Sequence, residues 1–142
     1  MADTSNYVRQ LEEACRLVAN AVGVTDYKLV YQSRSGPPTQ SWLEPDICDH
    51  LDALSDNGVE AVVVCPVGFV SDHLEVVWDL DTEAEEKARE LNIAFARAST
   101  PGTDPRFAQM ILELVEEHLS DAAPRGIGSV PKYGAPLTGS RC

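Results

Sequence analysis

The residues best suited to chemistry follow a strand-like segment. An apolar, β-branched run from Ala61 to Val67 leads within a few residues to Asp72, His73 and Glu75. Open α/β sheets bind ligands at the carboxyl ends of their strands, so these side chains stand where a site is expected. Two carboxylates and an imidazole could bind a divalent cation or move protons. Alternatively, Asp72 caps the following helix and His73 is an ordinary surface residue.

Two further carboxylates continue this pattern. Asp79 and Glu83 follow Glu75 at intervals of four residues, which on an α-helix places all three along one face. Like charges at that spacing repel by about 0.2–0.5 kcal/mol per pair, so the row mildly disfavours folding. A row of oxygen ligands could pass a hydrated cation toward a pocket, whereas an acidic chain also places such residues on a plain solvated face.

A loop earlier in the chain offers polar groups of another kind. Ser33 and Arg34, within Ser33-Arg34-Ser35-Gly36, supply a hydroxyl and a guanidinium that could hold a carboxylate. Trp42 precedes Pro45 and is placed to pack against the helix that follows. The chain contains no G-x-G-x-x-G, G-x-x-x-x-G-K-[ST] or G-x-S-x-G sequence, so common nucleotide-binding and hydrolase signatures are absent.

Hydrophobic periodicity predicts the elements that must position these residues. Helical spacing occurs over 5–22, 45–57, 74–91 and from 104 onward, and short β-rich runs occur over 27–32, 61–67 and 93–98. This alternation predicts an α/β fold with a parallel sheet. The central run has no polar alternation, which is typical of a strand covered on both faces. The predicted inward stripe of the third helix comprises Leu74, Val77, Trp78, Ala84, Ala88 and Leu91.

Residues at the predicted helix ends support these boundaries. Gly23 and Asn57-Gly58 stand where helices end. Pro45 is expected at an early helical position, and Asp104 is expected to cap the last helix. Beyond residue 120 the chain is rich in Pro and Gly and has no periodicity. We therefore divide it into an α/β domain over 1–120 and a flexible tail over 121–142.

Composition and charge exclude several classes of protein. The 142 residues are 44% hydrophobic and 24% charged, which are ordinary values for a globular domain. With 23 acidic and 11 basic residues, the formal net charge is −12, which leaves no basic patch for nucleic acid or an anionic membrane. No apolar run reaches the ~20 residues of a membrane span, and no signal peptide is evident. We therefore predict a cytoplasmic protein without a transmembrane segment.

Three blocks of sequence carry a resemblance to a known family. They are Gln32-Ser33-Arg34-Ser35-Gly36-Pro37, Trp42-Leu43-Glu44-Pro45-Asp46 and Pro66-Val67-Gly68-Phe69-Val70-Ser71-Asp72-His73-Leu74-Glu75. In this order they resemble the C-terminal half of a ferrochelatase, and the likeness runs from about Tyr7 to Leu119. Two further blocks, Val76-Val77-Trp78-Asp79-Leu80-Asp81 and Arg97-Ala98-Ser99-Thr100-Pro101, fit the bacterial branch that metallates coproporphyrin III.

The resemblance implies a lyase of haem and porphyrin biosynthesis. Ferrochelatases insert Fe²⁺ into a porphyrin, here expected to be coproporphyrin III, and release two protons. The reaction takes place between two similar chelatase-like domains, each a three-layer α/β structure with a parallel sheet. In this chain, the porphyrin-binding residues are expected to be Ser33, Arg34 and Trp42.

The resemblance also assigns roles to the acidic residues. It implies a catalytic role for Glu75, with Asp72 and His73 shaping the site beside it. Glu75, Asp79 and Glu83 match an acidic line of metal-binding residues that continues along a helix often drawn with a π-bulge. This line is expected to handle the iron substrate and to bind a second divalent cation.

Two features depart from the family pattern. The family's catalytic histidine, the first strand of this domain and the N-terminal ferrochelatase domain precede the part that this chain resembles. We therefore expect the chain to be incomplete at its N-terminus and inactive alone. Some bacterial ferrochelatases hold a [2Fe–2S] cluster, which needs four thiolates, largely through tail cysteines. Here Cys142 is the one tail cysteine, a leftover ligand of a cluster that the chain does not complete, and Cys15, Cys48 and Cys65 are predicted to be free thiols.

Two other functions remain open at this point. One is a stand-alone, non-catalytic α/β module that binds a divalent metal or a tetrapyrrole. The other is a divergent chelatase for a different tetrapyrrole, for example one that inserts cobalt. The blocks around Ser33 and Trp42 favour a ferrochelatase over the second of these. Porphyrin binding without metal insertion would favour the first.

Overall fold

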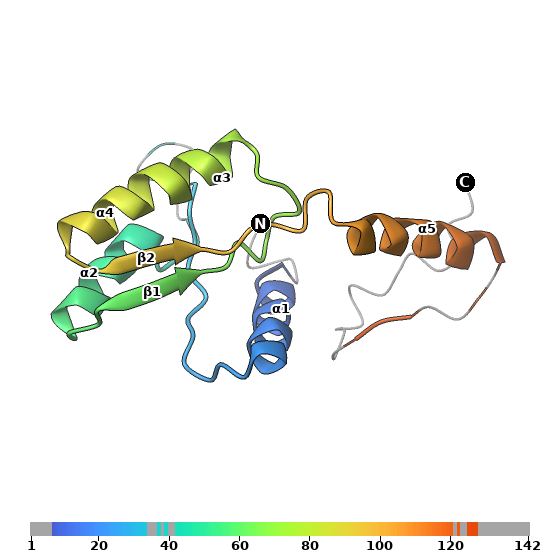
Figure 1. The fold of residues 1–142 in the computed structure, drawn as a ribbon, viewed down its shortest axis with the longest axis horizontal. Helices are drawn as coiled ribbons and strands as arrows, with labels where there is room; N and C mark the ends of the chain where they lie inside the picture. Colours follow the sequence, from blue (N-terminus) through green and yellow to red (C-terminus); the bar gives the residue numbers. More distant parts are fainter. Residues whose placement is uncertain are drawn as a thin grey trace. The chain divides into compact units, whose positions relative to one another are not determined.

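The candidate residues lie in a unit formed by Lys28–Gly102 (Figure 1). The computed structural model describes residues 7–33, 37, 39, 42–120, 122 and 125–127. A second unit comprises the described parts of Met1–Tyr27 and Thr103–Cys142. These units divide the predicted domain over 1–120, whose boundary with a tail stays a prediction.

The sheet of the Lys28–Gly102 unit has two parallel strands. Strand β1 (Ala61–Val64) pairs with β2 (Ala94–Arg97), with Ala61 opposite Ala94 and Val64 opposite Arg97. A helical crossover joins the strands, as a parallel pair requires. The prediction of an α/β fold with a parallel sheet is confirmed, and its strands at 61–67 and 93–98 are found in shortened form.

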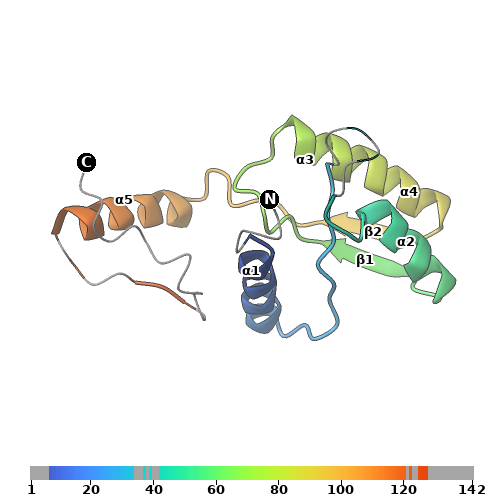
Figure 2. The same cartoon turned by 180° about the vertical axis from the view of Figure 1, so that it is seen from behind.

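One continuous helical stretch forms that crossover (Figures 1 and 2). It consists of α3 (Leu74–Trp78), the π-helical segment η2 (Asp79–Ala84) and α4 (Glu85–Glu90). Every fourth residue of the stretch is buried, namely Val76, Leu80, Ala84 and Ala88, each with at most 1% of its surface exposed. This buried row joins the core together with Ile47, Leu51 and Ile93, and Val62, Val64 and Phe95 of the strands pack against it.

The π segment explains why a four-residue repeat stays against the sheet. In an α-helix of 3.6 residues per turn, residues four apart drift steadily around the axis. A π-helix bonds residue i to i+5 and rotates less per residue than an α-helix. Within it, residues four apart drift around the axis in the opposite direction, so the buried row returns to the side that faces the sheet. The stripe predicted from α-helical spacing is therefore partly wrong. Ala84 and Ala88 are buried, but Leu74, Trp78 and Val77 are 81%, 56% and 39% exposed, respectively, and Val76 and Leu80 take the inner positions.

The helix α2 (Ile47–Asp56) packs into the same core through Ile47 and Leu51. Asp46 caps its start, because the side chain accepts a 2.8 Å hydrogen bond from the Cys48 N–H. Pro45 therefore lies just before the helix, and its predicted helical position is wrong. The predicted end is confirmed, since Asn57 is the C-cap and Gly58 follows with a φ of +74°, where a side chain would be strained.

Two predictions about strands are wrong in this unit. The run 27–32 forms no strand, because its β-prone residues meet no ladder partner in the described part of the chain. Only Tyr31 makes an isolated bridge, to Asp46. Strand β1 was expected to be covered on both faces, yet its residues alternate and Val63 is 77% exposed. Within this unit the helices α2 to α4 cover one face of the sheet.

The other unit contains two longer helices, α1 (Tyr7–Val22) and α5 (Pro105–Ser120). Gly23 ends α1 with a φ of +73°, as predicted. Asp104 caps α5 by accepting a 2.8 Å bond from the Arg106 N–H, and the Arg106 hydrogen bonds lower the pKa of Asp104 to about 2. The described helices include none that is long and apolar enough to cross a membrane. Most of the predicted tail lies outside the described residues.

Two leucines of the helical stretch allow a matched test of the core. Leu80→Ala should lower the free energy of unfolding by about 2–5 kcal/mol, because it leaves a cavity beneath η2. Leu74→Ala removes the same atoms from a side chain that is 81% exposed and should change it by less than about 0.5 kcal/mol. Urea unfolding of the full chain, followed by circular dichroism, measures both. Equal losses would contradict the assignment of the buried row.

Candidate functional site

The connection from β1 to α3 forms the centre of the site. It starts at the carboxyl end of β1 and turns tightly, with backbone bonds from Val67 N to Cys65 O at 2.8 Å and from Phe69 N to Pro66 O at 3.1 Å. The Gly102 N–H donates to Val70 O at 2.7 Å, which ties this loop to the chain beyond β2. The prediction that Asp72, His73 and Glu75 follow the carboxyl end of a parallel strand is thus confirmed.

His73 caps the helix α3. Its Nδ1 accepts a 3.5 Å hydrogen bond from the Val76 N–H, and its ring meets that of Phe69 edge to face, with centroids 5.0 Å apart. When Nδ1 accepts in a neutral imidazole, Nε2 carries the proton. The idea that Asp72 is the cap is therefore wrong. His73 remains exposed to solvent, so its ring is still accessible.

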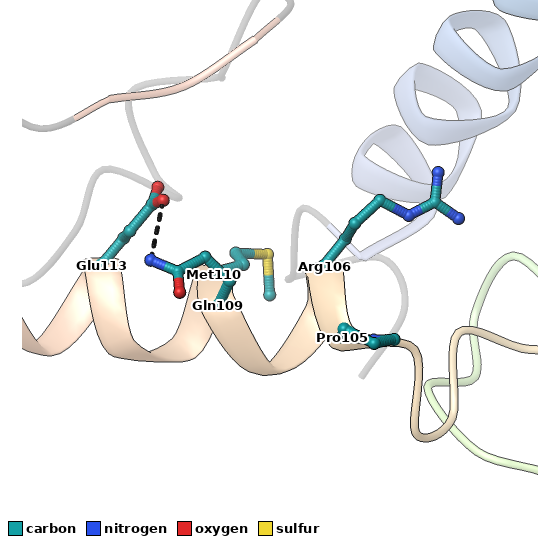
Figure 3. Close-up of a pocket in the computed structure, with 5 residues that line it drawn as sticks. All are labelled: Pro105, Arg106, Gln109, Met110 and Glu113. Carbon is teal, nitrogen blue, oxygen red and sulfur yellow. Dashed lines mark hydrogen bonds between the residues drawn. The ribbon is translucent and has the colours of Figure 1, made fainter.

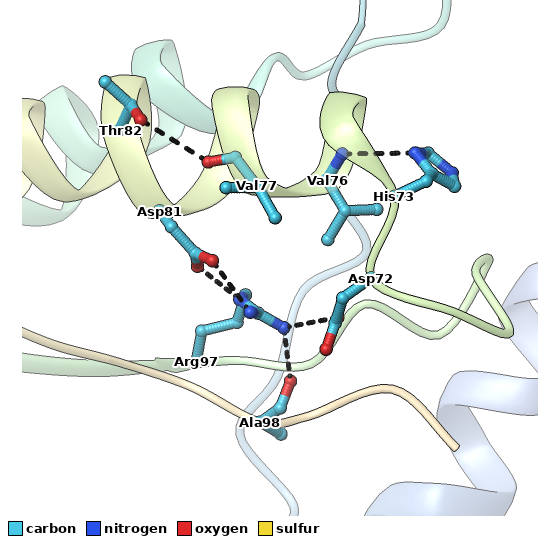
Figure 4. Close-up of polar contacts among 8 residues, drawn as sticks. All are labelled: Asp72, His73, Val76, Val77, Asp81, Thr82, Arg97 and Ala98. Atoms are coloured by element: carbon cyan, nitrogen blue, oxygen red, sulfur yellow. Dashed lines mark hydrogen bonds and ion pairs between the residues drawn. The ribbon is translucent and has the colours of Figure 1, made fainter. Parts of the chain in front are cut away.

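Asp72 instead takes part in an ion-pair network around Arg97 (Figure 4). The Arg97 Nη1 donates to Asp72 Oδ1 at 2.9 Å and to the Ala98 carbonyl at 3.2 Å. Its Nε and Nη2 both donate to the Asp81 carboxylate, Nη2 at 2.8 Å. The hydrogen bonds with Asp81 raise the pKa of Arg97 above its usual value. Sequence analysis assigned no role to Arg97 or Asp81.

The predicted acidic row, Glu75, Asp79 and Glu83, runs along α3 and η2. Each member stands one position before a buried residue, Val76, Leu80 or Ala84. The row therefore keeps a fixed register beside the buried row, and the π-helix that the resemblance implied is present in this segment. Glu75 and Glu83 are exposed, and Asp79 is partly buried.

These carboxylates form a line and not a closed cage. Within the part of the chain that the structure describes, no three His, Cys, Asp or Glu side chains gather closely enough to hold a metal ion together. The next position of the row is Lys87, whose Nζ lies 2.7 Å from Asp52 on α2. The acidic row is thus followed by a cation at its C-terminal end. Such an arrangement suits attraction and passage of a hydrated cation better than tight coordination.

Two of the three predicted porphyrin-contacting residues lie in the described chain. Ser33, with a φ of +60°, donates its hydroxyl to Asp79 Oδ2, which joins this loop to the acidic row across 46 positions of sequence. Trp42 is 37% exposed, and its indole N–H donates to the Gln32 carbonyl at 3.3 Å. Its aromatic face is therefore partly available to a flat ligand. Arg34 lies outside the described residues.

The cysteines give no support for an iron–sulfur cluster. Burial raises the pKa of the Cys48 thiol and of the Cys65 thiol, which disfavours the thiolate that a cluster requires. Cys142 lies outside the described residues. The residues that are described do not fit such a cluster.

A separate open pocket lies on α5 (Figure 3). It is lined by Pro105, Arg106, Gln109, Met110 and Glu113. Gln109 donates to Glu113 at 3.2 Å, and Arg106 pairs with Asp104. The polar side chains of this pocket thus have partners within or beside it, and none of the predicted site residues lines it.

Comparisons with known proteins support the resemblance. The ferrochelatase family model matches residues 1–119. The chain is 62% identical over 136 residues to a coproporphyrin III ferrochelatase of Nocardia farcinica, 55% identical over 139 residues to one of Mycolicibacterium smegmatis, and 52% identical over 138 residues to one of Mycolicibacterium vanbaalenii. Each match covers 96% of this chain but only 39–41% of the relative. On the extent of these matches, the chain belongs to the ferrochelatase family.

Proposed function

We propose that this chain contributes part of the active site of a coproporphyrin III ferrochelatase, a lyase of haem biosynthesis. The observation that carries this proposal is the 62% identity to a relative with that name, over nearly the whole chain. The reaction exchanges the two N–H protons of a porphyrin for Fe²⁺. Because the chain spans about 40% of its relatives' length, the remaining residues of the site are proposed to come from sequence outside it.

Glu75 is the residue proposed to act on the reacting atoms, with Asp72 and His73 positioned beside it. Its carboxylate stands in the first turn of α3, exposed and at the carboxyl end of the sheet. A carboxylate there can accept a pyrrole proton or bind the incoming metal through hard oxygen ligands. His73 caps the same helix, so it helps to fix where that helix begins. Asp72, paired with Arg97, supports the segment rather than offering a free charge.

Asp79 and Glu83 are proposed to extend the site as a path for hydrated cations. Carboxylate oxygens attract divalent ions that keep most of their water, and a line without a cage releases them readily. A second divalent cation would therefore be bound weakly along the row. Ser33 supports this arrangement by holding Asp79 through its hydroxyl. Lys87, paired with Asp52, marks the end of the path.

Porphyrin contacts are proposed for Ser33, Arg34 and Trp42. A guanidinium can bind a porphyrin carboxylate through two parallel hydrogen bonds, and an indole can stack on the ring system. The connection between Ser33 and Asp79 supports a common site for the porphyrin loop and the metal row. The cytoplasmic location and the N-terminal ferrochelatase domain as a partner stay predictions of the same proposal.

The leading alternative is a non-catalytic module that binds a metal or a tetrapyrrole. A single chimera separates these two functions. In it, this chain replaces the segment of the Nocardia farcinica relative that it matches over 136 residues. We expect the chimera to convert coproporphyrin III and Fe²⁺, or Zn²⁺ as a fluorescent substitute, to the metalloporphyrin. A chimera that binds the porphyrin but inserts neither metal would favour the module.

In the active chimera, Glu75→Gln should lower kcat for metal insertion by about 10²- to 10⁴-fold, because the amide can neither accept a proton nor carry charge. Porphyrin affinity, measured by fluorescence titration, should change little. Glu86→Gln provides the matched control, since Glu86 is an exposed residue of α4 outside the acidic row. Wild-type turnover in the Glu75 variant, or an equal loss in both variants, would contradict the role of Glu75.

Cation binding by the acidic row can be tested without the porphyrin. Mn²⁺ added to the full chain should bind weakly, as measured by electron paramagnetic resonance of the free ion. Glu83→Gln should weaken that binding by about three- to tenfold, because one of three carboxylates is lost. Glu86→Gln removes the same charge from the chain at a position outside the row and should have less effect. Similar affinities in the two variants would show that binding depends on net charge alone.

A further inference from the structure

Arg97 stands out among the described cations of the Lys28–Gly102 unit. It ends strand β2, and its side chain is only 15% exposed. Three of its nitrogens make four hydrogen bonds, to two carboxylates and one carbonyl (Figure 4). By comparison, Arg89 makes a single 3.8 Å contact with Glu85, and its side chain is 68% exposed. Exposed pairs of that kind contribute little to stability, whereas a half-buried bidentate pair fixes geometry.

The two partners of Arg97 flank Glu75 and Asp79 in the sequence. Asp72 comes three positions before Glu75, and Asp81 lies midway between Asp79 and Glu83. One guanidinium therefore bonds the loop that precedes α3 and the middle of η2 at the same time. The Ala98 carbonyl fixes the guanidinium itself to the backbone beyond β2. The segment that carries the acidic row is thereby bonded to the end of β2 through the carboxylates of Asp72 and Asp81.

Charge gives a second reason for this connection. Seven acidic residues fall between positions 72 and 86, so the segment repels itself. Arg97 pairs with Asp72 and Asp81, so its one positive charge offsets half of their combined negative charge. These bonds do not involve Glu75, Asp79 or Glu83, of which Asp79 accepts the Ser33 hydroxyl. The same cation therefore engages two carboxylates of the segment that lie outside the acidic row.

We propose that Arg97 is a positioning residue for metal insertion, one that holds the π-helical segment in the register that aligns Glu75, Asp79 and Glu83. The catalytic part of this inference rests on the proposed function. Its structural part, that the guanidinium fork maintains the π segment, stands on the contacts alone. A lysine would keep the charge but could not form the fork to Asp81 while also reaching Asp72.

The structural part is tested by hydrogen exchange in the full chain, read by mass spectrometry. Arg97→Lys should speed exchange of the amides over 75–84 by about tenfold while α2 keeps its protection, because local opening follows the lost contacts. Arg89→Lys makes the same change on the exposed face of α4 and should leave both regions as in wild type. If Arg97→Lys does not fold, Asp81→Asn removes the same fork from the other side. Unchanged exchange over 75–84, or equal acceleration in α2, would overturn the proposal.

The catalytic part is tested in the chimera. Arg97→Lys should raise the KM for Zn²⁺ or lower kcat by about tenfold while the KM for the porphyrin stays within about twofold, because only the metal row is misaligned. Activity of Arg97→Lys equal to wild type would overturn a positioning role. If the unsubstituted chimera inserts no metal, the proposed function fails, whereas the exchange experiment still decides whether Arg97 maintains the π segment.

Discussion

The packing of one buried row against a two-stranded sheet organises the rest of this unit. Val76, Leu80, Ala84 and Ala88 lie at every fourth position of the helical stretch, and each is at most 1% exposed. The two alanines let the helix approach the sheet closely, and the larger pair fill the space near the site. A regular α-helix would carry such a row gradually away from the sheet, so the π segment Asp79–Ala84 is needed to keep it there.

The position of the acidic row follows from this packing. Glu75, Asp79 and Glu83 each precede a buried residue, so their register follows the core, supported by the proposed hold of Arg97, and not their own charges. Burial of a side chain such as Val76 or Leu80 contributes about 1.5–3 kcal/mol, whereas repulsion between two carboxylates at helical spacing costs about 0.2–0.5 kcal/mol. Packing therefore prevails over repulsion, and three carboxylates persist side by side. Arg97 lowers the remaining repulsion by pairing with Asp81 of the stretch and with Asp72 just before it.

Much of this arrangement could be predicted from the sequence, and the exceptions have physical causes. The parallel sheet and the site at its carboxyl end followed from an apolar run that leads into Asp72, His73 and Glu75. The π-helix followed from the resemblance, yet the inward stripe was still assigned by α-helical spacing, which placed Leu74 and Trp78 inside. The alternative interpretation of Asp72 as a cap rested on side-chain preference alone, but Arg97 lies close enough to pair with its carboxylate. The residues around Arg97 do not indicate this pairing, because nothing in the local sequence distinguishes this arginine from others at the end of a strand. The roles of the individual site residues remain predictions.

The central claim is that a row of carboxylates, held in register by the core, handles the divalent cation that is inserted. Anomalous scattering from a crystal of the chimera soaked with Mn²⁺ tests it most directly. We expect a peak within about 2–2.3 Å of a carboxylate oxygen of Glu75, Asp79 or Glu83, or at the longer distance of a hydrated ion beside them. Ordered Mn²⁺ only at other acidic residues, with the row intact and vacant at the same concentration, would contradict the account.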